Sequence, residues 1–463
     1  MREPSKIIDI HCHTFNLKYL PIAGVLTAYT KNILPLKVAK ATEHILIMLT
    51  KSSKLNISQK IGLLDDDSKT FVEDLLVLSD EEVIEDIALR ATYENHLFND
   101  EVLQEAIVML DVQGDEKNAM PFVKTYELKR FDDQEFEKFI FPLLKKILNL
   151  ALTGFYYLKW FRFMMRGEKS IYKYLLKHNK GVENYIFHMM DTYKCFQYKN
   201  GTYSEPILKI DSQINKMEGL VRYSKNKLLG FVAFNPHRNN GLKIVQDALK
   251  FDGFIGVKFY PPLNYRAIGN DDELIEKRIH ALFTWCVEED VPVFTHCTST
   301  GFESVPDKSG KNANPSIWEQ LLEKNEFKDL RLCLGHAGGE DGWKTPFDET
   351  INDGQLSDYA KGVYKLCISK KNVYCEVGFL AHIYDDNERA NFIKRLLYLL
   401  SDENAGKYKF RDKICYGSDY HILFNDGLEK SYLNTFKKIF SNNDFESYRE
   451  AFFHENATSF LNR

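Results

Sequence analysis

Short apolar runs that alternate with helical patterns, from about residue 181 to the end, constrain the fold of this chain most strongly. Each run finishes in polar or Gly-rich residues, and a helical pattern then leads to the next run. Including the run at 7–10, there are eight predicted strands, and the other seven are 185–190, 230–234, 253–259, 291–295, 331–334, 373–377 and 413–416. Several of them are spaced by roughly 40 residues, which suits βα units better than a Greek key or a meander. We therefore predict an α/β fold, a (β/α)8 TIM barrel.

Composition narrows the class of partner. The chain has 463 residues and a formal net charge of -5, so nothing at this level indicates nucleic acid or an anionic membrane as a partner. The eight cysteines are scattered and contain no Cys-x-x-Cys pair, which is typical of reduced thiols in the cytosol. The N-terminus runs into the first strand without an apolar leader. We therefore expect a cytoplasmic protein whose partner is a small molecule.

The gap between the first two predicted strands is far longer than a βα loop should be. Residues 21–180 are helical in pattern, and a capping box at 79–82 opens one of the helices. The apolar stretch at 147–165 has an uncharged part well short of the roughly 20 residues that cross a bilayer. We predict a barrel formed by residues 1–20 and 181–463, and a helical insertion, 21–180, at its mouth. The insertion would serve as a lid or as the contact of a homodimer.

Four histidines and one aspartate lie where predicted strands end: His11, His13, His296, His336 and Asp419. A strand that carries His-x-His points both imidazoles to the same side. A lone histidine on a strand is more often a satisfied core residue, but packing gives no reason for five such residues to gather at the carboxyl ends of barrel strands, where catalytic groups lie. Imidazole and carboxylate together suit a zinc-like divalent ion. The pattern indicates a catalytic metal site.

Three segments carry a resemblance to a known family. They are Gly-Phe-Ile-Gly-Val-Lys-Phe-Tyr-Pro at 253–261, Gly-His-Ala-Gly-Gly at 335–339 and Tyr-Gly-Ser-Asp-Tyr at 416–420. With His-x-His on the first strand, this series resembles the amidohydrolase superfamily, and within it the amidohydrolase-related branch that includes aminocarboxymuconate semialdehyde decarboxylase. The resemblance covers residues 1–20 and about 181–463 and leaves out the insertion.

The resemblance implies a metal shell and roles for its residues. His11, His13, His296 and Asp419 would bind one divalent metal ion, zinc by preference. Asp419 would also accept a proton from water and deliver it to the leaving group, and His336 would stabilise charge on the substrate oxygen. A bound ion of this kind lowers the pKa of its water to near 7, which makes hydrolysis feasible at neutral pH.

Lys258 and several loop residues are further candidates. In some branches of the superfamily a lysine at the place of Lys258 is carbamylated and bridges two metals, whereas in mononuclear members such a lysine faces the substrate. Arg266 after the fourth strand could hold a substrate carboxylate as a bidentate fork, or be a solvated loop residue. The other substrate-binding candidates are His237 and Trp343, while His421 lies close enough to Asp419 to be considered.

Three functions stay open from the residues. The first is a metal-dependent hydrolase of a small lactone, ester or amide that uses a metal-activated water. The alternative is a non-oxidative decarboxylase with the same metal site. A second alternative is a barrel that binds a ligand without catalysis, although a complete set of metal positions argues against loss of activity.

Overall fold

The computed structural model describes residues 4–30, 36, 39–40, 43, 160, 163–344, 347, 356–425 and 427–462. The chain divides into two compact units. The first unit comprises Met1–Phe15, Lys169–Cys195 and Ile207–Arg463, and the second comprises Asn16–Glu168 and Phe196–Pro206. Most of the predicted insertion, including its capping box and most of the apolar stretch at 147–165, lies outside the described residues, so its role as a lid or dimer contact stays a prediction.

Eight parallel strands form the sheet of the first unit. Their order is β1-β2-β5-β6-β7-β8-β9-β10, and each ladder joins strands that follow one another in the barrel order. The strands are β1 Ile8–Cys12, β2 Asn184–His188, β5 Leu228–Ala233, β6 Phe254–Phe259, β7 Val293–Thr295, β8 Leu332–Leu334, β9 Val373–Glu376 and β10 Ile414–Cys415. Every predicted strand overlaps one of these, and the prediction of a (β/α)8 barrel is confirmed.

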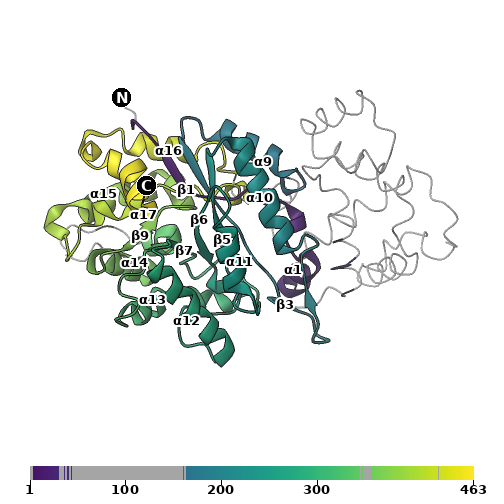
Figure 1. Ribbon diagram of the computed structural model, residues 1–463. Helices are drawn as coiled ribbons and strands as arrows, with labels where there is room; N and C mark the ends of the chain where they lie inside the picture. The colour runs from purple at the N-terminus through teal and green to yellow at the C-terminus, as the bar shows by residue number, and fades with distance from the viewer. Residues whose placement is uncertain are drawn as a thin grey trace, which may run out of the picture. The chain divides into compact units, whose positions relative to one another are not determined.

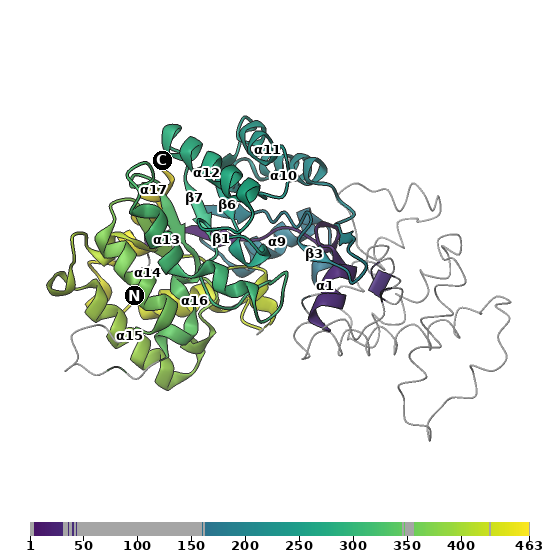
Figure 2. The same cartoon turned by 90° about the horizontal axis from the view of Figure 1, so that it is seen from below.

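Helices lie around the outside of these strands (Figures 1 and 2). They are α9 Glu168–His178, α10 Ile210–Ser224, α11 Gly241–Ala248, α12 Glu273–Glu288, α13 Pro315–Leu322, α14 Asp358–Ser369, α15 Asp386–Leu400, α16 Tyr432–Ile439 and α17 Asn456–Leu461. Helix α12 shows why they pack this way. Its buried side chains recur every three or four residues, so they form one stripe that faces the strands, and the Asp272 carboxylate caps its first turn.

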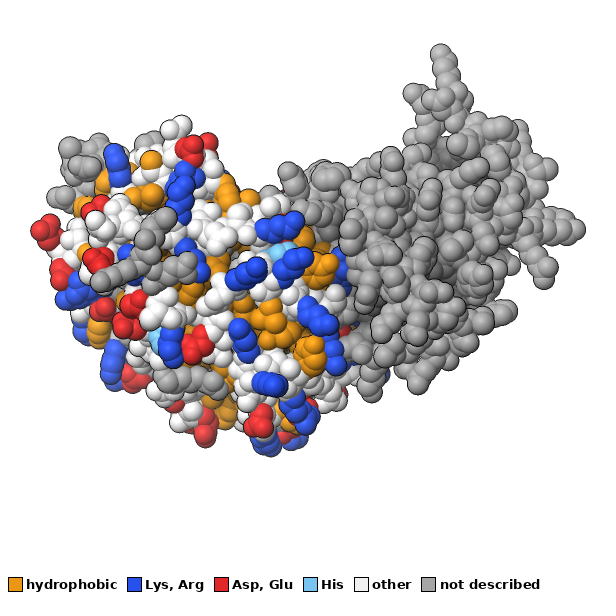
Figure 3. Space-filling model, turned by 90° about the horizontal axis from the view of Figure 1, so that it is seen from above, with side chains coloured by type: hydrophobic (Ala, Val, Ile, Leu, Met, Phe, Trp, Pro, Cys, Tyr) orange, Lys and Arg blue, Asp and Glu red, His pale blue; other side chains and the backbone are white. Residues whose placement is uncertain are grey.

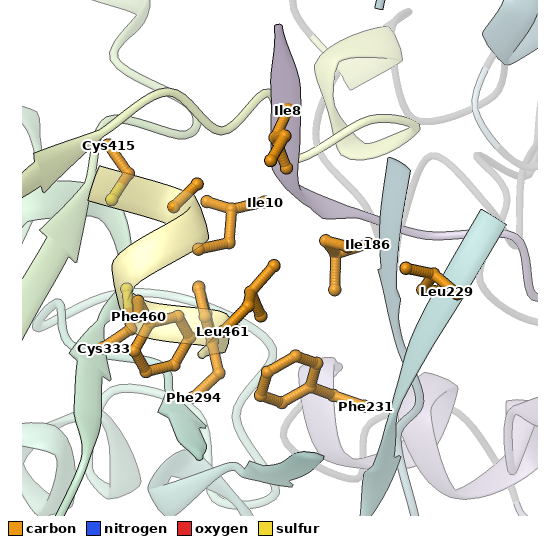
Figure 4. Close-up of a cluster of buried hydrophobic side chains, with 11 residues drawn as sticks. Ile8, Ile10, Ile186, Leu229, Phe231, Phe294, Cys333, Cys415, Phe460 and Leu461 are labelled. Carbon is orange, nitrogen blue, oxygen red and sulfur yellow. The ribbon is translucent and has the colours of Figure 1, made fainter. Parts of the chain in front are cut away.

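The barrel interior is filled by apolar side chains from nearly every strand. Ile8 and Ile10 of β1 meet Phe231 of β5 and Phe294 of β7, and all four are at least nine-tenths buried. Phe460 and Leu461 of α17 belong to the same cluster, so this last helix contributes to the core (Figure 4). Close packing of this kind makes the barrel a solid support for its loops rather than a channel.

The barrel closes where β1 meets the segment that follows β10. The backbone N–H of Ile10 donates to the carbonyl of Tyr416 at 3.2 Å, and Cys12 forms an isolated bridge with Tyr420. The buried carboxylate of Asp9 adds side-chain bonds there, since Oδ1 accepts from the Ser418 N–H at 2.9 Å and Oδ2 accepts from its hydroxyl at 2.6 Å. The first and last strands are thereby held in fixed register.

The second unit contains a helix and a small sheet among the described residues. Helix α1 spans Ile22–Tyr29, and β3 (Phe196–Gln197) pairs antiparallel with β4 (Tyr203–Ser204). Gly24 allows α1 to approach this hairpin, since a Cβ there would lie 2.5 Å from Cβ of Ser204. Its backbone N–H donates to the Ser204 hydroxyl at 3.0 Å.

Charged side chains of both signs and the lack of a membrane-spanning helix characterise the part of the chain that the structure describes. Basic and acidic side chains both occur on the face shown in Figure 3, in keeping with the small net charge. Among the described residues, no helix is both long enough and apolar enough to span a membrane. All eight cysteines are buried and free.

Candidate active site

The two histidines of β1 point to one side, as the His-x-His spacing predicts. The ring centroids of His11 and His13 are 5.1 Å apart. The ladder between β1 and β2 shifts register between Asp9 and Cys12, a local irregularity of the kind that bends a strand and re-aims its side chains. Ile8 and Ile10 of β1 belong to the core, whereas His11 and His13 place their imidazoles at the carboxyl end of the strand.

Partners at Nδ1 determine which nitrogen of each imidazole carries the lone pair. Nδ1 of His13 lies 3.0 Å from the carbonyl of His188, which can only accept, so this nitrogen carries the hydrogen. Nδ1 of His11 lies 3.0 Å from Oε1 of Glu376 at the end of β9, and a carboxylate there is again an acceptor. Both Nε2 atoms are then left with a free lone pair, the form in which imidazole binds a metal.

Asp419 faces both lone pairs. Its Oδ1 lies 3.1 Å from Nε2 of His13 and 3.3 Å from Nε2 of His11. The residue has φ +57°, a left-handed conformation that costs energy outside glycine and is found at functional sites. With these hydrogen positions three electron-pair donors converge without a hydrogen between them, an arrangement that suits a cation.

A divalent metal ion fits this set. The ligand atoms of His11, His13 and Asp419 all lie within 4.8 Å of one another, and all three residues are buried. Nε2 of His11 is fully buried and has no hydrogen-bond partner among the described residues. Two imidazoles and one carboxylate leave open positions for water or substrate, which is typical of catalytic rather than structural sites. The donor set suits zinc and also other divalent first-row ions.

His336 and His296 lie beside this triad. His336 follows β8 in a turn with φ +61°, its backbone N–H donates to Oε1 of Glu376 at 2.7 Å, and its Nδ1 donates to the carbonyl of Gly378 at 3.0 Å. His296 follows β7 and donates from Nε2 to the carbonyl of Thr300 at 2.7 Å. Nε2 of His336 and Nδ1 of His296 lie 3.0 Å apart. In this structure His296 contacts the group through His336, and its role as a direct ligand stays a prediction.

Lys258 supplies a cation to the same end of the barrel. It lies on β6, is 2% exposed, and its Nζ has no hydrogen-bond partner among the described residues. The ammonium lies 4.3 Å from the ring centroid of Phe294. Burial lowers the pKa of Lys258 to about 8, while Asp419 and Glu376 oppose that shift, so the side chain is mostly protonated at pH 7.

Burial controls the protonation of the other groups. It lowers the pKa of His11, His296 and His336, which keeps these imidazoles neutral. Burial raises the pKa of Glu376 to about 8, although two backbone N–H donors act against the rise. For Asp419 burial also acts upward, but its contact with His13 and the charges of neighbouring groups, Lys258 among them, outweigh it, and its pKa is lowered.

Three residues of this region escaped the sequence analysis: Asp9, His188 and Glu376. His188 lies at the end of β2, donates from Nε2 to the carbonyl of Ile10 at 2.8 Å, and has its ring centroid 4.7 Å from that of His11. Asp9 lies inside β1, and His188 and Glu376 are the last residues of β2 and β9. A polar residue inside a buried strand is a usable signal, because burying it without a partner is costly.

The other predicted substrate-binding residues are Arg266, Trp343 and His237, and each contacts other neighbours. Arg266 pairs with the exposed Asp271 at 3.3 Å, and Nε1 of Trp343 donates to the carbonyl of Ala337 at 3.0 Å. The ring centroid of His237 lies 6.3 Å from that of Tyr265, and burial lowers its pKa. Among the described residues, no hydrogen bond or ion pair joins these three side chains to the histidine group.

His421 is buried beside the triad and bonds to the protein. Its Nε2 lies 3.1 Å from the carbonyl of Phe15, and burial lowers its pKa to about 3. It is therefore a neutral imidazole that donates to the backbone, and its ring centroid lies 6.2 Å from that of His13.

Comparisons with known proteins give one matching family and several distant structural neighbours. A model of an amidohydrolase family matches residues 225–463, more than half of the chain. No curated protein matches it in sequence. Among solved structures, an amidohydrolase from Burkholderia multivorans with bound zinc is 9% identical, with a TM-score of 0.42 over 64% of this chain and 87% of that one.

Two decarboxylases are similar to the same degree. The 2,6-dihydroxybenzoate decarboxylase from Rhizobium is 12% identical, with a TM-score of 0.42 over 67% of this chain and 93% of that one. The 5-carboxyvanillate decarboxylase from Novosphingobium aromaticivorans, with bound manganese, is 12% identical, with a TM-score of 0.42 over 69% and 89%. These scores are low, and the barrel assignment stands on the strand order itself.

Proposed function

We propose that this chain, which belongs to the amidohydrolase family, is a metal-dependent enzyme that removes a carboxylate group from a small organic acid as carbon dioxide. The observation that carries the proposal is the buried Lys258 ammonium beside the triad of His11, His13 and Asp419. A charged group that is buried without a partner is costly, so a site that keeps one is built to receive a counter-ion.

Charge balance supports an anionic substrate. A bound divalent ion and the Lys258 ammonium together carry three positive charges, and the Asp419 carboxylate offsets one of them. Glu376, with a pKa of about 8, offsets a second only once it has lost its proton. Net positive charge is therefore left for the ligand. Buried in a region of low effective dielectric, that charge favours a substrate carboxylate far more than it would in water.

The chain's own groups suit the proton transfer that decarboxylation needs. When carbon dioxide leaves, the carbon–carbon bond breaks, its electron pair stays on the substrate carbon, and that carbon must gain one proton. Lys258, with a pKa of about 8, is protonated at neutral pH and can donate it, then regain a proton from solvent. His336 stays neutral, and because its Nδ1 donates to the carbonyl of Gly378, its Nε2 can accept a hydrogen from a substrate hydroxyl. A bound divalent ion supplies a Lewis acid that polarises such an oxygen.

Hydrolysis of a lactone, ester or amide is the second candidate. It is favoured by the Asp419 carboxylate, whose Oδ1 lies among the ligand atoms and could take a proton from an attacking water and pass it to the leaving group. We place decarboxylation first because the buried Lys258 ammonium favours an anionic substrate, with zinc as the preferred ion and manganese to be compared.

The test is a screen of small aromatic and unsaturated carboxylic acids with protein loaded with zinc or manganese. We expect metal-dependent release of carbon dioxide, uptake of one solvent deuterium on the product carbon in D2O, and loss of both in Lys258→Gln. Turnover of lactones or esters with uptake of oxygen from labelled water, and no carbon dioxide from any acid, would establish hydrolysis instead. Arg278→Gln serves as control, because that cation bonds to the carbonyl of Pro236 and to Asn239, away from the histidine group.

A further inference from the structure

A single carboxylate joins the two strand ends that carry His11 and His336. Oε1 of Glu376 accepts from the backbone N–H of His336 at 2.7 Å and lies 3.0 Å from Nδ1 of His11. Oε2 accepts from the backbone N–H of Gly378. Glu376 is fully buried at the end of β9, so these contacts, and not solvent, satisfy its oxygens.

Glycines in neighbouring segments leave room for the Glu376 carboxylate. A Cβ on Gly417 would lie 2.3 Å from Oε2 of Glu376, and a Cβ on Gly378 would lie 2.7 Å from the same atom. A Cβ on Gly335 would lie 3.5 Å from Oε1. None of the three has a positive φ, so the backbone does not require glycine at these positions. The segments after β9 and β10 therefore each leave out a side chain where the Glu376 carboxylate lies, whereas a Cβ on Gly335 would lie closer to the carbonyl of Thr295, at 2.9 Å.

The contacts of Glu376 indicate that it orients His11 and is not itself a metal ligand. Glu376, His11 and His336 also form a group of ligand atoms within 4.8 Å. However, Glu376 meets the Nδ1 face of His11, whereas His13 and Asp419 gather at the Nε2 face. Two backbone N–H groups already bond to the carboxylate, and an ion placed against it would have to displace them.

We infer that Glu376 is a positioning residue that keeps the hydrogen of His11 on Nδ1, aims the Nε2 lone pair at the cation position, and fixes the turn that carries His336. This inference rests on the cation site of the proposed function. Carboxylates that accept from the second nitrogen of a ligand histidine orient the ring and raise its basicity, and their loss typically weakens metal binding 10- to 100-fold.

Zinc affinity, measured by competition with a chromophoric chelator at about pH 7.5, tests the inference. We expect Glu376→Gln to bind zinc 10- to 100-fold more weakly than the wild type, because the amide places an NH2 group against one of three donors. Gly417→Ala should weaken zinc binding in the same direction, because its methyl group displaces the carboxylate while leaving it ionisable. Glu276→Gln is the matched control, because this carboxylate of α12 also accepts from two backbone N–H groups, those of Gly269 and Asn270, and should leave the affinity unchanged.

Nitrogen NMR of histidine side chains gives a second readout, taken on the wild type. In the metal-free wild type at about pH 9, where the Glu376 carboxyl is ionised, we expect His11 to carry its hydrogen on Nδ1. His11→Asn identifies the signals by their loss. A wild-type spectrum with the hydrogen on Nε2 would overturn the inference directly, as would wild-type zinc affinity in folded Glu376→Gln and Gly417→Ala.

The two proposals fail in different ways. A wild type that binds no zinc, manganese or other divalent ion removes the cation site and with it the proposed function. A wild type that binds an ion tightly, together with a Glu376→Gln protein that binds it equally well, leaves the proposed function standing and refutes the positioning role alone.

Discussion

The loops that follow β8 and β9 are joined by Glu340, and replacing it by Gln should lower the free energy of unfolding. Oε1 of Glu340 lies 2.7 Å from Nζ of Lys344, and Oε2 accepts from the backbone N–H of His382 at 3.0 Å. Hydrogen bonds with His382, opposed by burial and aided by Lys344, lower the pKa of Glu340 to about 2 from its ordinary 4.5. Glu340→Gln removes the negative charge while keeping the shape of the side chain.

The magnitude follows from that pKa. Each unit of difference between the folded and unfolded states corresponds to about 1.36 kcal/mol, so the full shift corresponds to about 3 kcal/mol. The Glu340 side chain is 31% exposed, and solvent screens such a pair, so we expect a loss of about 1–2 kcal/mol at pH 7. Because the folded pKa is depressed, the contribution is complete above the unfolded value of 4.5 and is lost as the pH falls towards 2.

Urea unfolding of the wild type and Glu340→Gln, followed by tryptophan fluorescence from about pH 6 to about pH 3, measures this difference. The two midpoints should approach each other as the pH falls, with about half of the difference gone at the acid end. A difference that stays constant with pH would show that Gln perturbs packing and not charge. Equal stability at pH 7 would refute the role assigned to these contacts.

Three further predictions concern the metal site and the barrel. His296→Ala should lower metal content and activity together. His336→Asn should keep about one equivalent of metal while turnover falls by about 10²–10³. Elemental analysis and rate assays measure both variants, and the opposite pattern would exchange their roles. The affinity for zinc should rise up to about tenfold per pH unit below pH 8 and level off above it. Burial holds a proton on Glu376 below pH 8, and this proton must leave when the ion binds. A zinc affinity that does not change with pH would contradict this. Gly230→Ala should cost about 1–3 kcal/mol in urea unfolding, because its Cβ would lie 2.0 Å from the ring of Phe187, and a wild-type midpoint would show that the barrel tolerates the methyl group.

The strands of the barrel were predictable because parallel strands are buried on both faces. The predicted run at 373–377 corresponds to β9, Val373–Glu376, and the run at 413–416 to the shorter β10, Ile414–Cys415. The difference lies at the two ends of β10: the carbonyl of Lys413 still accepts from the Cys375 N–H of β9, whereas the Tyr416 N–H donates to the carbonyl of Phe452 instead. Apolar patterning therefore locates the strands, and hydrogen-bonding geometry decides where they end.

Only the main residues of the candidate site could be predicted from the sequence. His11 and Asp419 are separated by 408 positions, but the carboxyl ends of barrel strands meet on one face, so their proximity follows from the fold. The contact between Glu376 and Nδ1 of His11 could not be foreseen, because an isolated Glu in a strand does not reveal which strand end it will face. The pairing of His296 with the carbonyl of Thr300 depends on loop geometry and was likewise out of reach.

The closure of the barrel between β1 and the segment after β10 has a consequence for how the protein is made. A chain under synthesis presents His11 and His13 early, but Asp419 and the Ser418 partner of Asp9 emerge only when most of the polypeptide has already been built. A cation held by both ends would act as a reversible cross-link across a loop of about 400 residues, the kind of closure whose entropy is large but grows slowly with length. Ion uptake should then follow the joining of the last strand to the first, and an ion would slow the reopening of the barrel at that place.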